Sequence, residues 1–326
     1  MSPPPGDAPG VNPLRALALR ARAAIQSRQS RWLALPPGLR AILWVVLSGI
    51  LFSFMGVFVK LLGTRLAIPQ VAFFRALFGL AAILPFAIAA GPKVLATKHP
   101  LGHLARGLMG ATGMFCGFYA YTHLPLATAT AYSFTKPLFL VLLAAVFLGE
   151  TVRARRLTAM AVGFAGVLVM LRPHAGIEVA ALVALFGAAT VAGVVVAIKV
   201  LVRTERPVTV MFYFGVISTT ILAVPAWLVE APPSGGDLLL PIAIGPAGAS
   251  RHSPMTPAYT LTDATAIGPL DYLRLLYSAA FGYLIFGEVP DVWMWVGAGI
   301  IIASTLYIAH REAQLGKPRP PPVALD

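Results

Sequence analysis

Charged residues are scarce in this chain. They make up 11% of its 326 residues, whereas 58% of the residues are hydrophobic. A soluble protein of this length needs more polar surface than such a composition supplies, so a soluble enzyme or binding domain is excluded. The mean hydropathy of +0.81 places the chain in a lipid bilayer instead.

Cysteine and the common catalytic motifs are also lacking. The single cysteine, Cys116, has no partner for an internal disulfide and no metal-ligand spacing around it, so we expect a structural role. The sequence contains no G-x-x-x-x-G-K-[ST], H-E-x-x-H or G-x-S-x-G motif, which argues against an ATP-driven pump and common hydrolases. We therefore expect no catalytic residues, no cofactor and no metal. An intramembrane enzyme and a non-transporting scaffold or subunit are the alternatives to the function inferred below.

The two ends of the chain are polar and basic. Residues 1–40 are rich in Pro, Ala and Arg and lack the apolar core of a secretory signal peptide. We predict a disordered cytoplasmic tail there, with a short basic helix over 14–25 on anionic lipid as the alternative. Residues 311–326 are expected to form a second, solvated cytoplasmic tail.

Between the tails, apolar runs alternate with short polar segments. A helix needs about 20 apolar residues to cross the hydrocarbon layer of a bilayer. Runs of about this length predict ten membrane-spanning helices, over 41–63, 69–90, 103–121, 126–148, 157–171, 179–201, 208–229, 238–259, 264–286 and 292–309.

The chain contains an internal duplication. Residues 107–150 recur at 245–288, with an offset of 138 positions. Matching positions include A-Y-T at 120–122 and 258–260, G-E at 149–150 and 287–288, and Lys136 with Arg274. At an offset of 139 to 140, Lys60 meets Lys199 and Pro85 meets Pro225, so the copy extends back to the first span. We therefore expect two repeats of five spans each, over 41–172 and 178–310.

The net charge of +13 indicates membrane topology rather than nucleic-acid binding. Lys and Arg cluster before the first span and after the second, fourth, sixth and tenth spans, and they are nearly absent from the loops between. Because basic residues concentrate in cytoplasmic loops, both termini are predicted to be cytoplasmic. Five is an odd number of spans, so the second repeat must be inverted relative to the first, which is typical of secondary transporters.

Several motifs resemble one transporter family. They are FFRALFG from Phe73, FLGE from Phe147, GFAGVLVMLRP from Gly163 and DYLRLLYSAAFGYLIFGEVPD from Asp271. Over residues 41–312 the chain resembles the EamA branch of the drug/metabolite transporter (DMT) superfamily. This resemblance implies an all-α membrane protein with ten transmembrane helices in two inverted five-helix EamA-type repeats.

The resemblance also implies a function. Similar proteins are multi-pass proteins of the bacterial-type inner membrane that move small polar or amphipathic metabolites by alternating access. They include exporters of amino acids and importers of S-adenosylmethionine or riboflavin, so the cargo, the transport direction and the coupling ion are left open. The partners expected are a small-molecule substrate and the lipid bilayer, with no nucleic acid and with a homodimer left open.

One segment departs from the family pattern. Where the first repeat has G-M-F-C at 113–116, the second has R-H-S-P at 251–254. A charge beside a proline is costly in hydrocarbon unless it faces protein or water. Three alternatives are open: a broken helix lining the cavity, a span that ends near Ala249 before a polar loop, or an atypical, damaged repeat.

Two cations are predicted near the middle of the membrane. Lys136 and Arg274 each lie about eleven residues into their spans, or roughly 15 Å from the membrane face. Inversion brings these equivalent residues in from opposite sides, so both are candidates for a shared substrate cavity. Asp271 shares a helix face with Arg274 and is expected to pair with it, either as a structural lock or as a substrate contact. The excess of cations hints at a cargo bearing carboxylate or phosphate.

The other candidate substrate-binding residues are aromatic or lie early in a span. Tyr272 and Tyr277 match Phe134 and Phe139 of the first repeat and are candidates to contact a flat ligand. The remaining candidates are Tyr132, on the polar side of the fourth span, and Arg75, which follows the paired phenylalanines of the second. Lys60, Lys199, Glu150 and Glu288 are expected at the membrane faces, with the lysines snorkelling to the headgroups.

Overall fold

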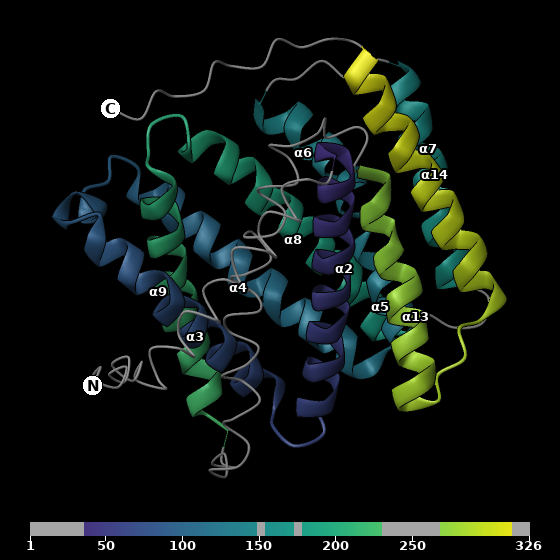
Figure 1. The fold of residues 1–326 in the computed structure, drawn as a ribbon, viewed down its shortest axis with the longest axis horizontal. Coiled ribbons are helices and arrows are strands. Elements are labelled where there is room, and N and C mark those ends of the chain that lie inside the picture. Colours follow the sequence, from purple (N-terminus) through teal and green to yellow (C-terminus); the bar gives the residue numbers. More distant parts are fainter. Residues whose placement is uncertain (1–35, 149–153, 173–177, 230–267, 315–326) are drawn as a thin grey trace, which may run out of the picture.

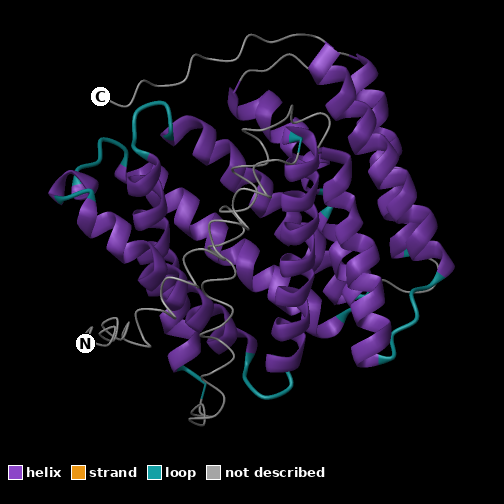
Figure 2. Ribbon diagram, in the orientation of Figure 1, coloured by secondary structure: helices purple, strands orange, loops and turns teal. Residues whose placement is uncertain are grey.

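The computed structural model describes residues 36–148, 154–172, 178–229 and 268–314, and every regular element within these ranges is helical (Figures 1 and 2). The elements are α2 (Pro37–Leu62), α3 (Ile68–Ala89), η1 (Pro92–Leu95), α4 (Pro100–His123), α5 (Leu126–Ser133), α6 (Lys136–Leu148), α7 (Ala154–Leu171), α8 (Val179–Leu201), α9 (Pro207–Trp227), η4 (Gly268–Tyr272), α13 (Leu273–Phe286) and α14 (Val292–Gln314). The predicted eighth span, the segment 251–254, Glu150 and residues 1–35 and 315–326 of the two predicted tails lie outside the described residues. Residues 37–40 and 311–314 of these tails are helical, because α2 begins at Pro37 and α14 continues to Gln314.

Five of the described helical segments are long and apolar enough to cross a membrane. They are Ile42–Leu62, Ile68–Ala89, Leu126–Phe147, Val179–Leu201 and Pro207–Trp227. Two shorter apolar helical segments cover Leu157–Leu171 and Val292–Ile308. The all-helical membrane class expected from the composition is thereby confirmed.

Proline sets the start of four of these helices. Pro37, Pro69, Pro100 and Pro207 each stand at the first or second position of their helix. A proline there costs nothing in hydrogen bonding, because the first N–H groups of a helix have no partner inside it. Proline therefore explains why these four helices begin where the polar segments end.

The fourth span is divided rather than continuous. Helix α5 ends at Ser133 and α6 begins at Lys136, with the N–H groups of Phe134 and Thr135 bonding to oxygens only three residues back. Pro137 explains the break, because it has no N–H to donate to the preceding turn. The ninth span changes at the equivalent place, where the 3-10 turn of η4 ends at Tyr272 and α13 begins.

Small residues bring the most closely packed helices together. The closest pairs are α4 with α8, α3 with α9, and α7 with α14; in Figure 1, α3 and α9 lie on one side of the bundle and α7 and α14 on the other. Between α7 and α14, a Cβ atom added to Gly166 would lie 2.9 Å from the backbone oxygen of Gly297. These two helices therefore approach backbone to backbone, as glycine allows in membranes.

Candidate functional site

Arg274 lies at the centre of a cluster of polar and aromatic residues. Its side chain is 6% exposed, and its guanidinium carbon lies 4.5 Å from the ring centre of Phe52 and 5.0 Å from that of Phe134. The Nε atom lies 3.3 Å from Oδ1 of Asp271, as the spacing of three residues predicts, but without the alignment of a hydrogen bond. Asp271 therefore offsets the charge of a cation that is otherwise held by two aromatic faces.

Tyr272 completes this group, which we call the central cluster: Phe52, Phe134, Asp271, Tyr272 and Arg274. The rings of Phe134 and Tyr272 meet edge to face with their centres 4.8 Å apart. The Tyr272 hydroxyl forms a hydrogen bond with Thr305 of α14. The cluster is thus built where the fourth and ninth spans leave regular α-helical geometry.

A chain of hydroxyl groups fixes the helices around the cluster. Thr130 on α5 donates to Ser278 on α13 at 2.9 Å, and Ser278 donates to Ser53 on α2 at 3.3 Å. Ser53 in turn donates to the backbone oxygen of Arg274 at 3.3 Å. All four groups are buried and partnered, as polar groups in a membrane interior must be.

Two other predicted site residues, Tyr277 and Lys136, lie near the central cluster in space or in sequence. Tyr277 lies beside Arg274, since a Cβ atom on Gly49 would meet both, at 3.2 and 3.3 Å. Lys136 is half-buried and begins α6, two positions after Phe134.

Two predicted site residues lie elsewhere in the bundle. Tyr132 is 2% exposed and belongs to the apolar core. Arg75 lies on α3, where its Nη1 atom is 3.2 Å from the sulfur of Met114 on α4. The structure therefore brings Asp271, Tyr272 and Arg274 together, with Tyr277 next to them.

An ion pair that the sequence did not predict lies at the end of α2. Lys60 pairs with Glu288 and also donates to the backbone oxygen of Leu124 at 2.7 Å. The second oxygen of Glu288 accepts from the N–H of Leu126 at 2.7 Å. Lys60 therefore joins three chain segments, at the ends of α2, α4 and α13, instead of extending freely to the headgroups. We call this group the Lys60 clasp.

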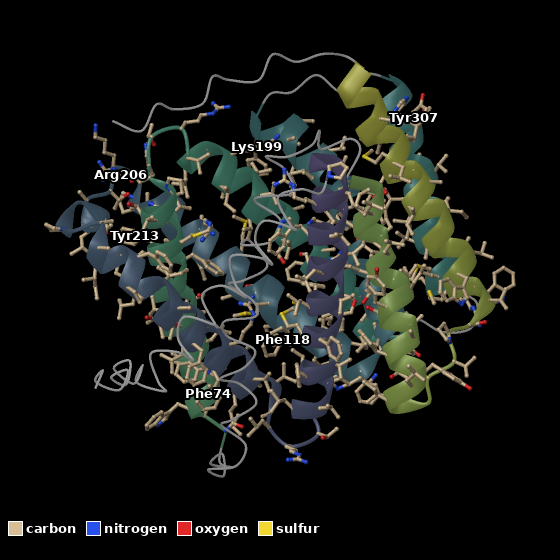
Figure 3. The ribbon with its side chains drawn as sticks, in the orientation of Figure 1. Phe74, Phe118, Lys199, Arg206, Tyr213 and Tyr307 are labelled. Carbon is tan, nitrogen blue, oxygen red and sulfur yellow. The ribbon has the colours of Figure 1, made fainter. Side chains whose placement is uncertain are left out.

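Two further buried polar residues, His103 and Arg106, were not among the predicted site residues, because Arg106 was counted with the basic residues that follow the second span although the third predicted span, 103–121, contains it. Arg106 lies six residues inside α4, is 7% exposed and stacks on Phe214 of α9 at 4.4 Å. His103, one turn earlier, is 1% exposed and stacks on Tyr213, which Figure 3 labels on α9, at 4.7 Å. The sequence signal was Pro100, which marks where α4 begins.

The polar loops near these residues are held by Glu205. Its carboxylate accepts hydrogen bonds from the Thr97 hydroxyl at 2.8 Å and the Lys98 N–H at 2.9 Å. Burial alone would raise the pKa of this carboxyl. The two hydrogen bonds and the nearby His103 and His99 lower the pKa by a larger amount, so the pKa lies below its ordinary value of 4.5. Within the described ranges, no three His, Cys, Asp or Glu side chains gather as metal ligands would.

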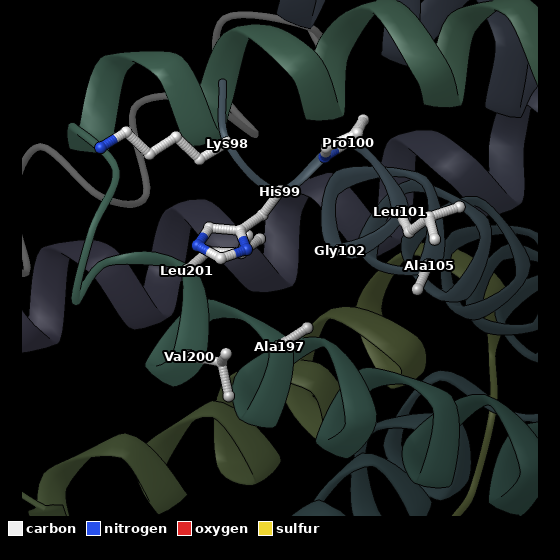
Figure 4. Close-up of a pocket in the computed structure, with 9 residues that line it drawn as sticks. All are labelled: Lys98, His99, Pro100, Leu101, Gly102, Ala105, Ala197, Val200 and Leu201. Atoms are coloured by element: carbon white, nitrogen blue, oxygen red, sulfur yellow. The ribbon is translucent and has the colours of Figure 1, made fainter. Parts of the chain in front are cut away.

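A shallow groove of about 300 Å³ lies beside these loops, between the start of α4 and the end of α8 (Figure 4). Lys98 and His99 line part of this groove, and apolar residues of α4 and α8, such as Leu101 and Leu201, line the rest. The groove is built from helix ends, apart from the central cluster. It is therefore a feature of the protein surface rather than a continuation of the cluster.

Comparison with known sequences consistently indicates one family of transporters. The profile of the EamA-like transporter family matches residues 39–172 and again residues 179–309. An S-adenosylmethionine uptake transporter of Rickettsia prowazekii is 36% identical over 280 residues, covering 86% of this chain and 95% of the relative.

Two other relatives have different cargo. A riboflavin transporter of Rhizobium johnstonii is 34% identical, with 83% of this chain and 91% of the relative covered. A pseudopaline exporter of Pseudomonas aeruginosa is 30% identical, with 83% and 96% covered. One solved crystal structure has a similar fold, with a TM-score of 0.55 and 20% identity over 83% of this chain and 98% of its own.

Proposed function

The chain belongs to the EamA-like transporter family, and from this membership we propose that it carries a small polar or amphipathic metabolite across the bacterial inner membrane by alternating access. It is a membrane transporter, as its relatives are. The proposal extends this to ten helices in two inverted five-helix repeats, over 41–172 and 178–310, with both termini in the cytoplasm.

The contacts between the fourth and ninth spans support the inversion. Leu126, the first residue of the fourth span, is bonded to Glu288, which follows the end of the ninth. Phe134 and Tyr272, at equivalent positions within the two spans, meet each other. Two equivalent segments that touch end to start and also at the same inner position run in opposite directions. This arrangement is expected for repeats related by a two-fold axis in the membrane plane.

The central cluster is the substrate-binding site in this proposal. The observation that carries it is Arg274, a buried cation held between two aromatic rings at the break of two equivalent helices. Discontinuous helices at mid-depth are where secondary transporters bind their cargo. Phe52, Phe134 and Tyr272 supply apolar and aromatic surface, and Arg274 with Asp271 supplies charged hydrogen-bonding groups.

The names of two relatives suggest the shape of the cargo. S-adenosylmethionine and riboflavin both contain a flat heterocycle, which packs favourably on aromatic side chains.

We include in the proposed site Tyr277, which neighbours Arg274, and Lys136, which follows the break in the fourth span. Arg75 and Tyr132 lie outside the central cluster and are not included in this site.

Transport assays on purified protein test this function. The full chain is reconstituted in liposomes, and uptake of S-adenosylmethionine, riboflavin and amino acids is measured for the wild type, Arg274→Met and Lys136→Met. Arg203→Met, an exposed cation in the turn after α8, is the matched control. We expect one compound to be transported by the wild type and the control and to be lost in the cluster variant. Unchanged uptake in a folded Arg274→Met variant would show that the site is elsewhere, and no uptake of any metabolite would favour a scaffold.

A further inference from the structure

Several arginines of the described residues have a buried nitrogen atom without a hydrogen-bond partner, and two of them, Arg75 and Arg106, lie on α3 and α4. In Arg106 these atoms are Nε and Nη1, and in Arg75 the atom is Nε; all three atoms are buried. His103 adds both nitrogens of a ring that is 1% exposed and stands one turn before Arg106 on α4. These donors and ring nitrogens lie on helices α3 and α4, away from the central cluster.

The contacts that these arginines do make are with neutral groups. Arg106 stacks on the ring of Phe214, and Arg75 reaches the thioether of Met114. An aromatic face and a sulfur atom attract a guanidinium group, but they do not neutralise its charge. A buried cation normally has an anionic partner, because leaving it unpaired is costly.

Three carboxylates in the described part of the chain pair with other cations. Glu288 pairs with Lys60, Asp271 with Arg274, and Asp291 with Arg172. One oxygen of Glu205 accepts from Thr97 and Lys98. No ion pair joins a described carboxylate to Arg75 or Arg106.

The two arginines lie at different depths. Arg106 stacks on the ring of Phe214, which packs against Gly110 of α4, whereas Arg75 contacts Met114. Gly110 and Met114 are four residues apart, or about 6 Å along the helix axis, near the middle of α4. An anion that moves along this helix would pass from one to the other.

We propose that the cargo carries a carboxylate or phosphate group and that Arg106, supported by His103, and Arg75 bind this anion in succession as it moves along α4. The proposal rests on the transport function proposed above and names the class of cargo. A guanidinium group suits both anions, because its planar set of donors matches two oxygens at once. The central cluster would then hold the rest of the cargo while the arginines hold its charge.

The binding of small anions tests the site without knowledge of the cargo. The full-length protein is placed in nanodiscs of phosphatidylcholine, which has no net charge, so that anionic lipid headgroups are absent. The melting temperature is measured in acetate, inorganic phosphate and chloride at matched ionic strength, because a ligand that binds only the folded state raises it. We expect acetate or phosphate to raise the melting temperature above its value in chloride.

Variants assign that effect to the two arginines. Arg106→Met and Arg75→Met are expected to lower the apparent affinity for the stabilising anion about tenfold or more, whereas Arg203→Met leaves it unchanged. Arg106→Lys keeps the charge and is expected to keep part of the effect, which guards against a variant that merely folds poorly. No stabilisation of the wild type, or equal stabilisation of the wild type and both Met variants, overturns the proposal.

A second arm separates the cargo class from the transport function. Uptake is compared for S-adenosylmethionine and its decarboxylated form, and for riboflavin and riboflavin 5′-phosphate, since each pair differs by one anionic group. Preference for the member that carries the carboxylate or phosphate, reduced in Arg106→Met, supports the proposal. Transport of only the members that lack this group would overturn the proposed cargo class while leaving the transporter intact. Anion binding without any uptake would contradict the transport function instead.

Discussion

Phe134 and Tyr272 occupy the same position in the two sequence repeats, 138 residues apart, and their rings touch each other. Each residue lies where its span departs from regular α-helix. This contact therefore joins the two halves of the chain at the irregular points of both spans.

Replacing Phe134 by leucine tests the role of its ring in cargo binding. The change keeps apolar volume but removes the aromatic face that contacts Tyr272 and Arg274. We expect the affinity for a flat cargo to fall about three- to tenfold, which is the range of one aromatic contact. Phe147→Leu is the control, because Phe147 is 71% exposed near the end of α6. Isothermal titration of the purified variants measures the difference; an equal loss in both would contradict a specific role.

The Lys60 clasp predicts a non-additive effect on stability. Lys60 and Glu288 are only 15% and 16% exposed, so removing one leaves the other charge partly buried without its partner. We expect Lys60→Met and Glu288→Gln each to lower the unfolding free energy by about 1–3 kcal/mol. The double variant is expected to lose less than the sum, because no unpaired charge is left. Unfolding in a detergent series gives these values, and strictly additive losses would mean that the two residues are not coupled.

Glu205 predicts a pH-dependent loss of stability at acidic pH. Its folded-state pKa lies below 4.5, so the bonded carboxylate stabilises the fold above about pH 4.5. That contribution is lost as pH falls from 4.5 through the lower folded-state value, because protonation removes the negative charge that strengthens the hydrogen bonds from Thr97 and Lys98. Melting temperatures of the wild type and Glu205→Gln, measured between neutral and acidic pH, are expected to converge in this window. A constant difference across the range would rule out the carboxylate as the cause.

A methyl group added at Gly166 is predicted to disturb the contact of α7 with α14. It would lie 2.9 Å from the backbone oxygen of Gly297, an atom that cannot rotate away. We expect Gly166→Ala to cost about 1–3 kcal/mol through overpacking. Gly299→Ala is the matched control on α14, since an added Cβ atom there meets nothing within 4 Å. The thermal stability of the two variants should differ, and equal behaviour would mean that the helices can separate freely.

The sequence predicted the features of the fold that depend on composition and local pattern. Runs of apolar residues located the described helices, and the prolines at 37, 69, 100 and 207 mark where four of them begin. The duplication also predicted which residues are equivalent, including the pair that meets in the central cluster. Asp271 and Arg274 were paired correctly because three residues along a helix bring side chains together.

Contacts between distant segments could not be predicted in this way. Lys60 and Glu288 are 228 positions apart, and no periodicity links them. Arg106 was counted as a loop charge because the rule for membrane topology counts basic residues near helix ends without asking which way they point. Its burial against Phe214 depends on how α4 packs on α9, which only the tertiary structure shows.

The glycine contact between α7 and α14 joins the fifth predicted span of one repeat to the fifth of the other. Neither half can form this joint from its own residues. A half expressed alone would expose its glycine surface to lipid. The same surface on a second copy of that half would be the most similar partner available to it. Two separately synthesised halves should therefore find each other in the membrane, with this surface as their point of attachment.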